Sequence, residues 1–232
     1  VSGSKTFITN GSQADLVLTV VKTDPDDRAA GISLMLVPTS AEGFSRGRVL
    51  DKIGMKGQDT SELFFDNVRV PVANLVGETG RGFIQLMEQL PQERLLQAIR
   101  SVATVEAALE WTVEYTSERK AFGQLISDFQ NTRFTLADVK SKTVMLRVFV
   151  DRCIQMHLEG KLDAVDAAIT KLLSSEMLGE LLDKCLQLFG GYGYMWEYPI
   201  ARAWADARMT RIAGGTCEIM REIIGRSLIG KI

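Results

Sequence analysis

The sequence has little of the chemistry that metal sites and disulfide frameworks require. Its 232 residues include one histidine, His157, so a metal site built on histidine is nearly excluded, because no second imidazole shares the ligation. There are three cysteines, at positions 153, 185 and 217, with no CxxC pair, and three thiols cannot all pair within one chain. This indicates a reducing compartment, with Cys153 and Cys185 as small buried apolar residues.

Long apolar runs and an excess of positive charge are also absent. No stretch of about 18 apolar residues occurs, so no integral membrane segment is expected. The formal net charge is -2, which argues against a nucleic-acid partner. Hydrophobic residues make up 46% and charged residues 24%, which is typical of a globular protein with a sizeable core. The chain opens with Val1 and not with Met, so we expect any targeting segment to precede it.

The first seventy residues have the pattern of antiparallel strands. β-Branched and apolar runs cover residues 16–21, 32–37, 46–53 and 62–65, and turn residues such as Asp24-Pro25-Asp26 separate them. Runs of this length predict strands with at least one buried face. We therefore interpret residues 1–76 as part of a β-domain.

From about Gly80 onward the pattern is helical. One apolar stripe at spacings of three and four residues comprises Leu178, Leu181, Leu182, Cys185, Leu186 and Phe189. A second helix is predicted over about 127–157, Gly160 should end it, and another should start near Asp163. Pro91 should kink the first helix. Long helices with short connections predict an antiparallel four-helix bundle over residues 77–232, and hence an α+β protein.

Four segments do not fit a generic helix or strand: Phe7-Ile8-Thr9-Asn10-Gly11, residues 118–124 (ERKAFGQ), 187–194 (QLFGGYGY) and 212–219 (IAGGTCEI). Singly, each is explained by helix caps, turns or dipole complementarity. Two of the glycine-rich turns adjoin predicted helix ends, whose free N–H groups can bind a phosphate or an oxyanion. No P-loop occurs, and the dinucleotide fingerprint fails because no βαβ unit surrounds the glycines.

Together with residues 51–61 (DKIGMKGQDTS), these segments resemble the acyl-CoA dehydrogenase family over essentially the whole chain. The resemblance implies the later part of the family's middle β-domain and its C-terminal four-helix bundle, without the N-terminal helical domain. It also implies an FAD-dependent enzyme that oxidises an acyl-CoA to trans-2-enoyl-CoA and passes electrons to an electron-transfer flavoprotein. A homotetramer would be expected, cytoplasmic in a bacterium and in the mitochondrial matrix in a eukaryote.

The resemblance assigns cofactor contacts to particular residues. Phe7 would pack against the flavin ring, and the Thr9 hydroxyl would lie near flavin N5. Thr216 and Glu218 match contacts within the same subunit. The residues that match contacts to the FAD of a neighbouring subunit are Arg119, Phe122, Gln130, Gln187, Leu188, Phe189, Gly190 and Gly191. An arginine suits a pyrophosphate because its planar fork offers paired donors.

The catalytic base departs from the commonest family pattern. Most members carry a glutamate immediately before the Gly-Thr pair, where this chain has Gly214. Two subgroups, long-chain and isovaleryl-type, carry the glutamate on the first bundle helix, and Glu93 matches that place. The backbone N–H of Gly214 would then donate to the thioester oxygen, while Arg94 and Gly215 match positions near the substrate. The alternative interpretation is that Glu93 has no catalytic role and is an ordinary solvent-exposed carboxylate on a helix.

Two alternatives remain open from the sequence. One is a relative that uses oxygen, an acyl-CoA oxidase or a flavin monooxygenase, although a monooxygenase needs no α-proton base. The other is a non-catalytic fragment or acyl-CoA-binding homologue, which the near-complete set of flavin motifs argues against. The Glu93 arrangement favours long-chain or branched acyl groups.

Overall fold

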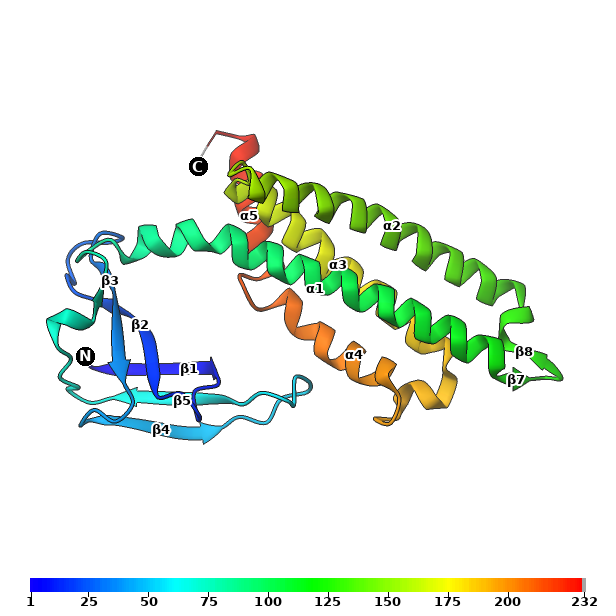
Figure 1. Ribbon diagram of the computed structural model, residues 1–232, viewed down its shortest axis with the longest axis horizontal. Coiled ribbons are helices and arrows are strands. Elements are labelled where there is room, and N and C mark those ends of the chain that lie inside the picture. The colour runs from blue at the N-terminus through cyan, green and yellow to red at the C-terminus, as the bar shows by residue number, and fades with distance from the viewer. Residues whose placement is uncertain (231–232) are drawn as a thin grey trace. The chain divides into compact units, whose positions relative to one another are not determined.

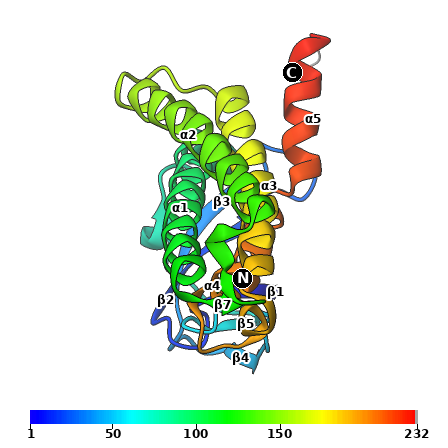
Figure 2. The ribbon, with the colours of Figure 1, turned by 90° about the vertical axis from the view of Figure 1, so that its right-hand side faces the viewer.

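A computed structural model describes residues 1–230 of the chain (Figure 1). The chain divides into two compact units, Val1–Gln89 and Leu90–Ile232, which are described separately below. Strands form the first unit, and helices dominate the second (Figures 1 and 2). The α+β class is therefore confirmed. Among the helices of residues 1–230, none is both long enough and apolar enough to cross a membrane.

The first unit contains two antiparallel sheets. One has the order β1-β5-β4 and is formed by Gly3–Thr9, Thr60–Phe65 and Phe44–Val49. The other has the order β2-β3-β6 and is formed by Leu16–Lys22, Ile32–Pro38 and Leu75–Val76, with the short helix η1 (Val72–Asn74) before β6. The apolar core of this unit comprises Val37, Leu63, Phe65 and Val68.

The strand predictions hold for three of the four runs, and the third run was wrong in its extent. β4 begins at Phe44 and ends at Val49, four residues short of the predicted Ile53. The pairing of β4 with β5 shifts register between Arg46 and Val49, which bends the strand. The chain then leaves the sheet in a turn in which Met55 adopts a φ of 52°.

Five helices make up most of the second unit, and α1 begins before it: α1 (Gly82–Glu118), α2 (Gln130–Leu158), α3 (Ala164–Leu188), α4 (Pro199–Ala207) and α5 (Cys217–Leu228). Short 3₁₀ segments connect them: η2 (Ile126–Asp128), η3 (Gly190–Tyr194) and η4 (Arg208–Arg211). A two-residue hairpin of β7 (Lys120–Ala121) and β8 (Gln124–Leu125) links α1 to η2. Pro91 lies inside α1, and the kink stays a prediction.

The apolar faces of the helices meet as the sequence pattern predicts. Leu178, Leu181, Leu182 and Cys185 of α3 are buried in one cluster with residues of α1, α2 and α4, and Phe189 closes it. Burial of each large aliphatic side chain contributes about 1.5–3 kcal/mol. Asp163 begins α3 by accepting hydrogen bonds from the backbone N–H groups of residues 165 and 166. All three cysteines are free and buried, which confirms the expected burial of Cys153 and Cys185.

Candidate active site

A glycine turn between η4 and α5 forms the centre of the site. Gly214 and Gly215 have φ values of 67° and 91°, in the left-handed region that glycine adopts without strain. Thr216 then caps α5, and its hydroxyl accepts a hydrogen bond of 3.3 Å from the backbone N–H of Ile219. No described residue accepts a hydrogen bond from the Gly214 N–H, and Gly214 is exposed. The turn therefore presents a donor to a ligand.

Helix α1 contacts this turn through Gln97. Its side-chain amide Nε2 lies 2.6 Å from the carbonyl oxygen of Thr210. Its Oε1 lies 2.8 Å from the place that a Cβ on Gly214 would occupy. A side chain at position 214 would therefore have to displace Gln97, in addition to adopting a strained backbone conformation. The local packing accommodates glycine.

Glu93 lies four residues before Gln97 on the same helix. Residues four apart are neighbours on one helix face, so Glu93 shares the face that meets the 210–214 segment. The Glu93 side chain is exposed, as a base that must reach a substrate requires. The sequence indicated both Glu93 and Gly214 but missed Gln97, whose spacing of four residues from Glu93 was the available signal.

Two buried cations flank the turn. Among residues 1–230, Arg94 and Lys171 are the charged side chains with the least exposure, at 6% and 0%. Lys171 Nζ donates a hydrogen bond of 2.6 Å to the carbonyl oxygen of Gly215, whereas Arg94 Nε is buried without a partner. Burial lowers the pKa of both groups, and the positive charge of Arg94 lowers that of Lys171 further. Sequence reasoning missed Lys171.

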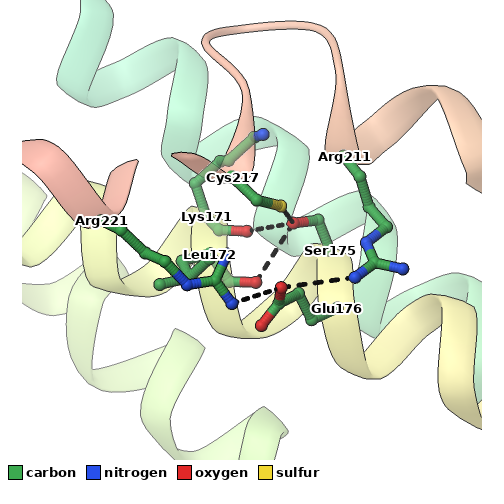
Figure 3. Close-up of polar contacts among 7 residues, drawn as sticks. All are labelled: Lys171, Leu172, Ser175, Glu176, Arg211, Cys217 and Arg221. Atoms are coloured by element: carbon green, nitrogen blue, oxygen red, sulfur yellow. Dashed lines mark hydrogen bonds and ion pairs between the residues drawn. The ribbon is translucent and has the colours of Figure 1, made fainter. Parts of the chain in front are cut away.

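An ion-pair bridge on α3 holds the segments on both sides of the turn. Glu176 Oε1 lies 2.6 Å from Arg221 on α5 and 3.4 Å from Arg211 on η4 (Figure 3). The preceding residue on α3 also contacts α5, since the Ser175 hydroxyl lies 3.5 Å from the Cys217 sulfur. The Lys171 side chain points toward the segment before α5 in the same view (Figure 3). Side chains of α3 therefore contact the chain on both sides of the turn.

The predicted contacts Thr216 and Glu218 lie at the N-terminus of α5. Glu218 is exposed, and its pKa is lowered, first by a hydrogen bond from its own backbone N–H and then by the Thr216 hydroxyl. Both residues follow the Gly214–Gly215 turn, and Arg94 lies on α1 in the same unit. Their placement gives α5 an N-terminus with donor groups near a charged ligand.

A second cluster of predicted residues surrounds a hollow of about 470 Å³ where α1 ends and α3 ends. Its lining includes Arg119, Leu188, Phe189, Gly190 and Gly191. Tyr115 stacks on Phe189 with ring centroids 4.3 Å apart, and its hydroxyl lies 3.2 Å from the Phe189 carbonyl oxygen. The Arg119 guanidinium lies over the Tyr192 ring at 5.4 Å.

Two features of this hollow suit a ligand that carries a phosphate and a flat ring. A Cβ added to Gly190 or Gly191 would meet no atom within 4 Å, so the backbone is open to a ligand. No described carboxylate forms an ion pair with Arg119, whose fork is suited to a phosphate. Flat aromatic rings and an uncompensated guanidinium are what an adenine and a pyrophosphate require.

The remaining predicted residues of this cluster lie nearby or beyond it. Phe122 is 97% exposed at the tip of the β7–β8 hairpin, with a φ of 53°, and its ring is 6.5 Å from that of Phe129. Gln130 begins α2, directly after Phe129. Gln187 lies in the last turn of α3 and is not part of the lining of the hollow.

Phe7 and Thr9 belong to the first unit. The pairing of β1 with β5 shifts register between Lys5 and Ile8, and Phe7 within this bulge has a φ of 62°. A bulky residue in the left-handed region is a strained outlier of the kind found at functional sites. The bulge leaves the ring of Phe7 76% exposed, and Thr9 is exposed at the strand end. These side chains are available to a flat ligand.

Comparison with known proteins identifies the class to which this fold and site belong. Residues 1–68 match the middle domain of acyl-CoA dehydrogenases, and residues 80–229 match the C-terminal domain of the same enzymes. The chain belongs to the acyl-CoA dehydrogenase family, whose members are FAD-dependent oxidoreductases.

Individual relatives agree with this assignment. The mitochondrial long-chain specific acyl-CoA dehydrogenase of Rattus norvegicus is 47% identical over 231 residues, 99% of this chain and 54% of the relative. A crystal structure of an acyl-CoA dehydrogenase from Geobacillus kaustophilus matches with a TM-score of 0.95 and 44% identity, covering 98% of this chain and 60% of that one. An acyl-CoA dehydrogenase from Bacillus anthracis complexed with FAD matches with a TM-score of 0.91 and 29% identity, covering 99% and 42%.

Proposed function

We propose that the protein catalyses FAD-dependent α,β-dehydrogenation of an acyl-CoA thioester, with Glu93 as the base. The observation that carries this proposal is the meeting of α1 with the glycine turn. Gln97, one helical turn after Glu93, contacts the segment in which the Gly214 N–H has no acceptor among the described residues. The chain spans about half the length of the rat relative, 54%, so the activity proposed is that of the complete protein.

The chain's own residues would act on the substrate in two ways. A carboxylate in water is too weak to remove the α-proton of a thioester, so the developing enolate needs a donor at its oxygen. The Gly214 N–H would donate to that oxygen while Glu93 takes the α-proton. Bound FAD supplies the acceptor for the β-hydrogen, which leaves with its electron pair as hydride. The product is a trans-2-enoyl-CoA, and Arg94 would help orient the thioester.

Several residues fit an FAD at this site. Phe7 and Thr9 of the first unit would contact the flavin ring. Thr216 and Glu218 of the second unit would contact the cofactor. Residues on or near the hollow would contact the FAD of a neighbouring subunit, namely Arg119, Phe122, Gln130, Gln187, Leu188, Phe189, Gly190 and Gly191. If two subunits share each cofactor, the enzyme must be oligomeric, and we propose a homotetramer.

We infer a long-chain or branched acyl group as substrate. The absence of a glutamate at position 214 and the presence of Glu93 support this subgroup, as does the 47% identity to a relative named long-chain specific. An electron-transfer flavoprotein is the proposed electron acceptor. The compartment would be the cytoplasm in a bacterium or the mitochondrial matrix in a eukaryote.

The proposal is tested by the anaerobic visible spectrum of the complete protein. Purified protein should be yellow, and a long-chain acyl-CoA should bleach the flavin band without oxygen. A shorter straight-chain acyl-CoA should bleach it more slowly. Protein that carries no flavin, or whose flavin stays oxidised with every acyl-CoA, would overturn the proposal. Rapid consumption of oxygen by the bleached enzyme would instead indicate an oxidase.

A further inference from the structure

The buried ammonium of Lys171 has no role in the proposed chemistry as described so far. Its side chain is 0% exposed and extends from α3 to the glycine turn, where Nζ lies 2.6 Å from the carbonyl oxygen of Gly215. A buried lysine is rare because its charge loses hydration, and the opposite charge of a carboxylate usually compensates for this loss. Here the hydrogen-bond acceptor is a backbone carbonyl.

The hydrogen bond from Lys171 lies at the flexible glycine turn, so it can restrict the conformation of that turn. Gly214 and Gly215 both have positive φ, so the turn has the backbone freedom to adopt other conformations. Gln97 fixes the chain before the turn at Thr210, and Lys171 fixes it after the turn at Gly215. The Gly214 N–H lies between these two fixed carbonyls and has no acceptor among the described residues.

We propose that Lys171 is a positioning residue that holds the Gly215 carbonyl and thereby aims the Gly214 N–H at the thioester oxygen. The inference rests on the proposed function, because it assigns the supporting group for the donor in that reaction. A donor that stabilises an oxyanion must be oriented before the reaction, and two consecutive glycines cannot supply that orientation themselves. Lys171 touches neither the reacting atoms nor the base.

A neutral residue in place of Lys171 distinguishes a role in positioning the Gly214 N–H from a role in stabilising the fold. Lys171→Met has a similar shape and removes a buried charge, a change that cores often tolerate. The matched control is Glu180→Gln on the same helix, which breaks the ion pairs to Lys142 and Lys184 and involves no residue of the turn. Both variants are made in the complete, flavin-loaded protein.

We expect Lys171→Met to retain flavin and to lower kcat by about 10- to 100-fold, below the 10²–10³-fold that follows removal of an entire oxyanion donor. KM should change by less than about threefold, because the ground-state thioester needs the donor far less than the enolate does. Glu180→Gln should keep kcat within about threefold of the wild type. A Lys171→Met enzyme with wild-type kcat, or an equal loss of kcat in Glu180→Gln, would overturn the inference.

A second readout does not depend on turnover. Acetoacetyl-CoA carries an acidic α-proton and can bind as its enolate without oxidation, so its ionisation in the complex reports on the donor alone. Lys171→Met should bind this enolate about 10- to 100-fold more weakly, in proportion to the loss of kcat. Amide hydrogen exchange of residues 213–216 should accelerate in the same variant, even if the wild type oxidises no acyl-CoA.

These readouts keep the two proposals apart. If no acyl-CoA bleaches the flavin of the wild type, the proposed function is wrong. Faster amide exchange at 213–216 in Lys171→Met would still show that Lys171 holds the Gly215 carbonyl. Should Lys171→Met lose its flavin, Lys171→Gln serves in its place, since the shorter uncharged amide cannot span the same distance. Unchanged enolate binding and unchanged exchange in that variant would refute the role of Lys171.

Discussion

Gln97 Nε2 donates a hydrogen bond of 2.6 Å to the carbonyl oxygen of Thr210, a residue 113 positions further along the chain. This bond joins the helix that carries Glu93 to the segment that carries Gly214. In the proposed function, it would bring a base on α1 and a backbone donor before α5 to the same thioester, since each lies four residues from one end of this bond.

Glu93→Gln should abolish proton abstraction without disturbing the fold. The amide has the shape of the carboxylate but cannot accept the α-proton, so the rate of anaerobic flavin bleaching should fall by at least about 10²–10⁴-fold. Flavin content and the position of the visible band should not change. Glu88→Gln, five residues earlier on α1, is the control and should bleach at the wild-type rate. Equal rates in the two variants would exclude Glu93 as the base.

Gly214→Ala should be destabilised for two independent reasons. A φ of 67° costs a residue with a side chain about 1–2 kcal/mol, and the new Cβ would lie 2.8 Å from Gln97 Oε1. Urea denaturation should show this loss together with a reduced kcat. Gly179→Ala is the control, because it lies inside α3 with no atom within 4 Å of its Cβ, and alanine should stabilise it by up to about 1 kcal/mol.

Phe7→Gly should weaken flavin binding while leaving the free energy of unfolding nearly unchanged. Glycine removes the left-handed strain at a φ of 62° but adds chain entropy in the unfolded state, so the free energy of unfolding should change by less than about 1 kcal/mol. Flavin should nevertheless dissociate more readily on gel filtration, because the exposed ring is lost. Leu18→Ala on β2, which removes another exposed apolar side chain, should retain flavin fully.

Arg119→Lys should weaken FAD binding while preserving the charge. Lysine lacks the planar fork for two parallel hydrogen bonds to a phosphate, so the Kd for FAD should rise about tenfold, as fluorescence titration of the apoprotein would measure. The same substitution at exposed Arg133, which donates to backbone carbonyls of η2, is the control. An unchanged Kd in Arg119→Lys would remove the hollow from the FAD site.

Glu106 and Arg147 should make α1–α2 packing weakly acid-sensitive. Two hydrogen bonds of 2.9 and 2.5 Å join them, and the Arg147 guanidinium lowers the pKa of Glu106 below its ordinary value of 4.5. A lowered pKa stabilises the fold above the ordinary value, and this contribution is lost as pH falls through the lowered one. Because both side chains are about one-third exposed, the effect should be under about 1 kcal/mol.

The measurement compares chemical denaturation of the wild type and Glu106→Gln. The difference in unfolding free energy should be present near neutral pH and shrink as the pH falls below 4.5, the ordinary pKa of the carboxyl group. A difference that persists at acidic pH would mean that Glu106 acts through packing and not through its charge.

The sequence predicted the helices well, and for a physical reason. Three- and four-residue spacing of Leu178, Leu181 and Leu182 requires a helix with one buried face, which α3 has. The end of β4 was missed because a bulge is set by pairing with β5, which no local pattern encodes. Lys171 lies on the buried side of α3, seven residues before Leu178. Lysine is rarely buried, so its burial could not be predicted without knowing that its ammonium group meets the Gly215 carbonyl.

The packing of Gln97 against Gly214 constrains how such an enzyme can evolve. A mutation that placed a carboxylate at position 214 would meet the Gln97 amide and a left-handed backbone before it could act as a base. A lineage that moves its base between the two positions must therefore change residue 97 or remodel the turn first. The order of mutations is restricted by one side chain that takes no part in the chemistry.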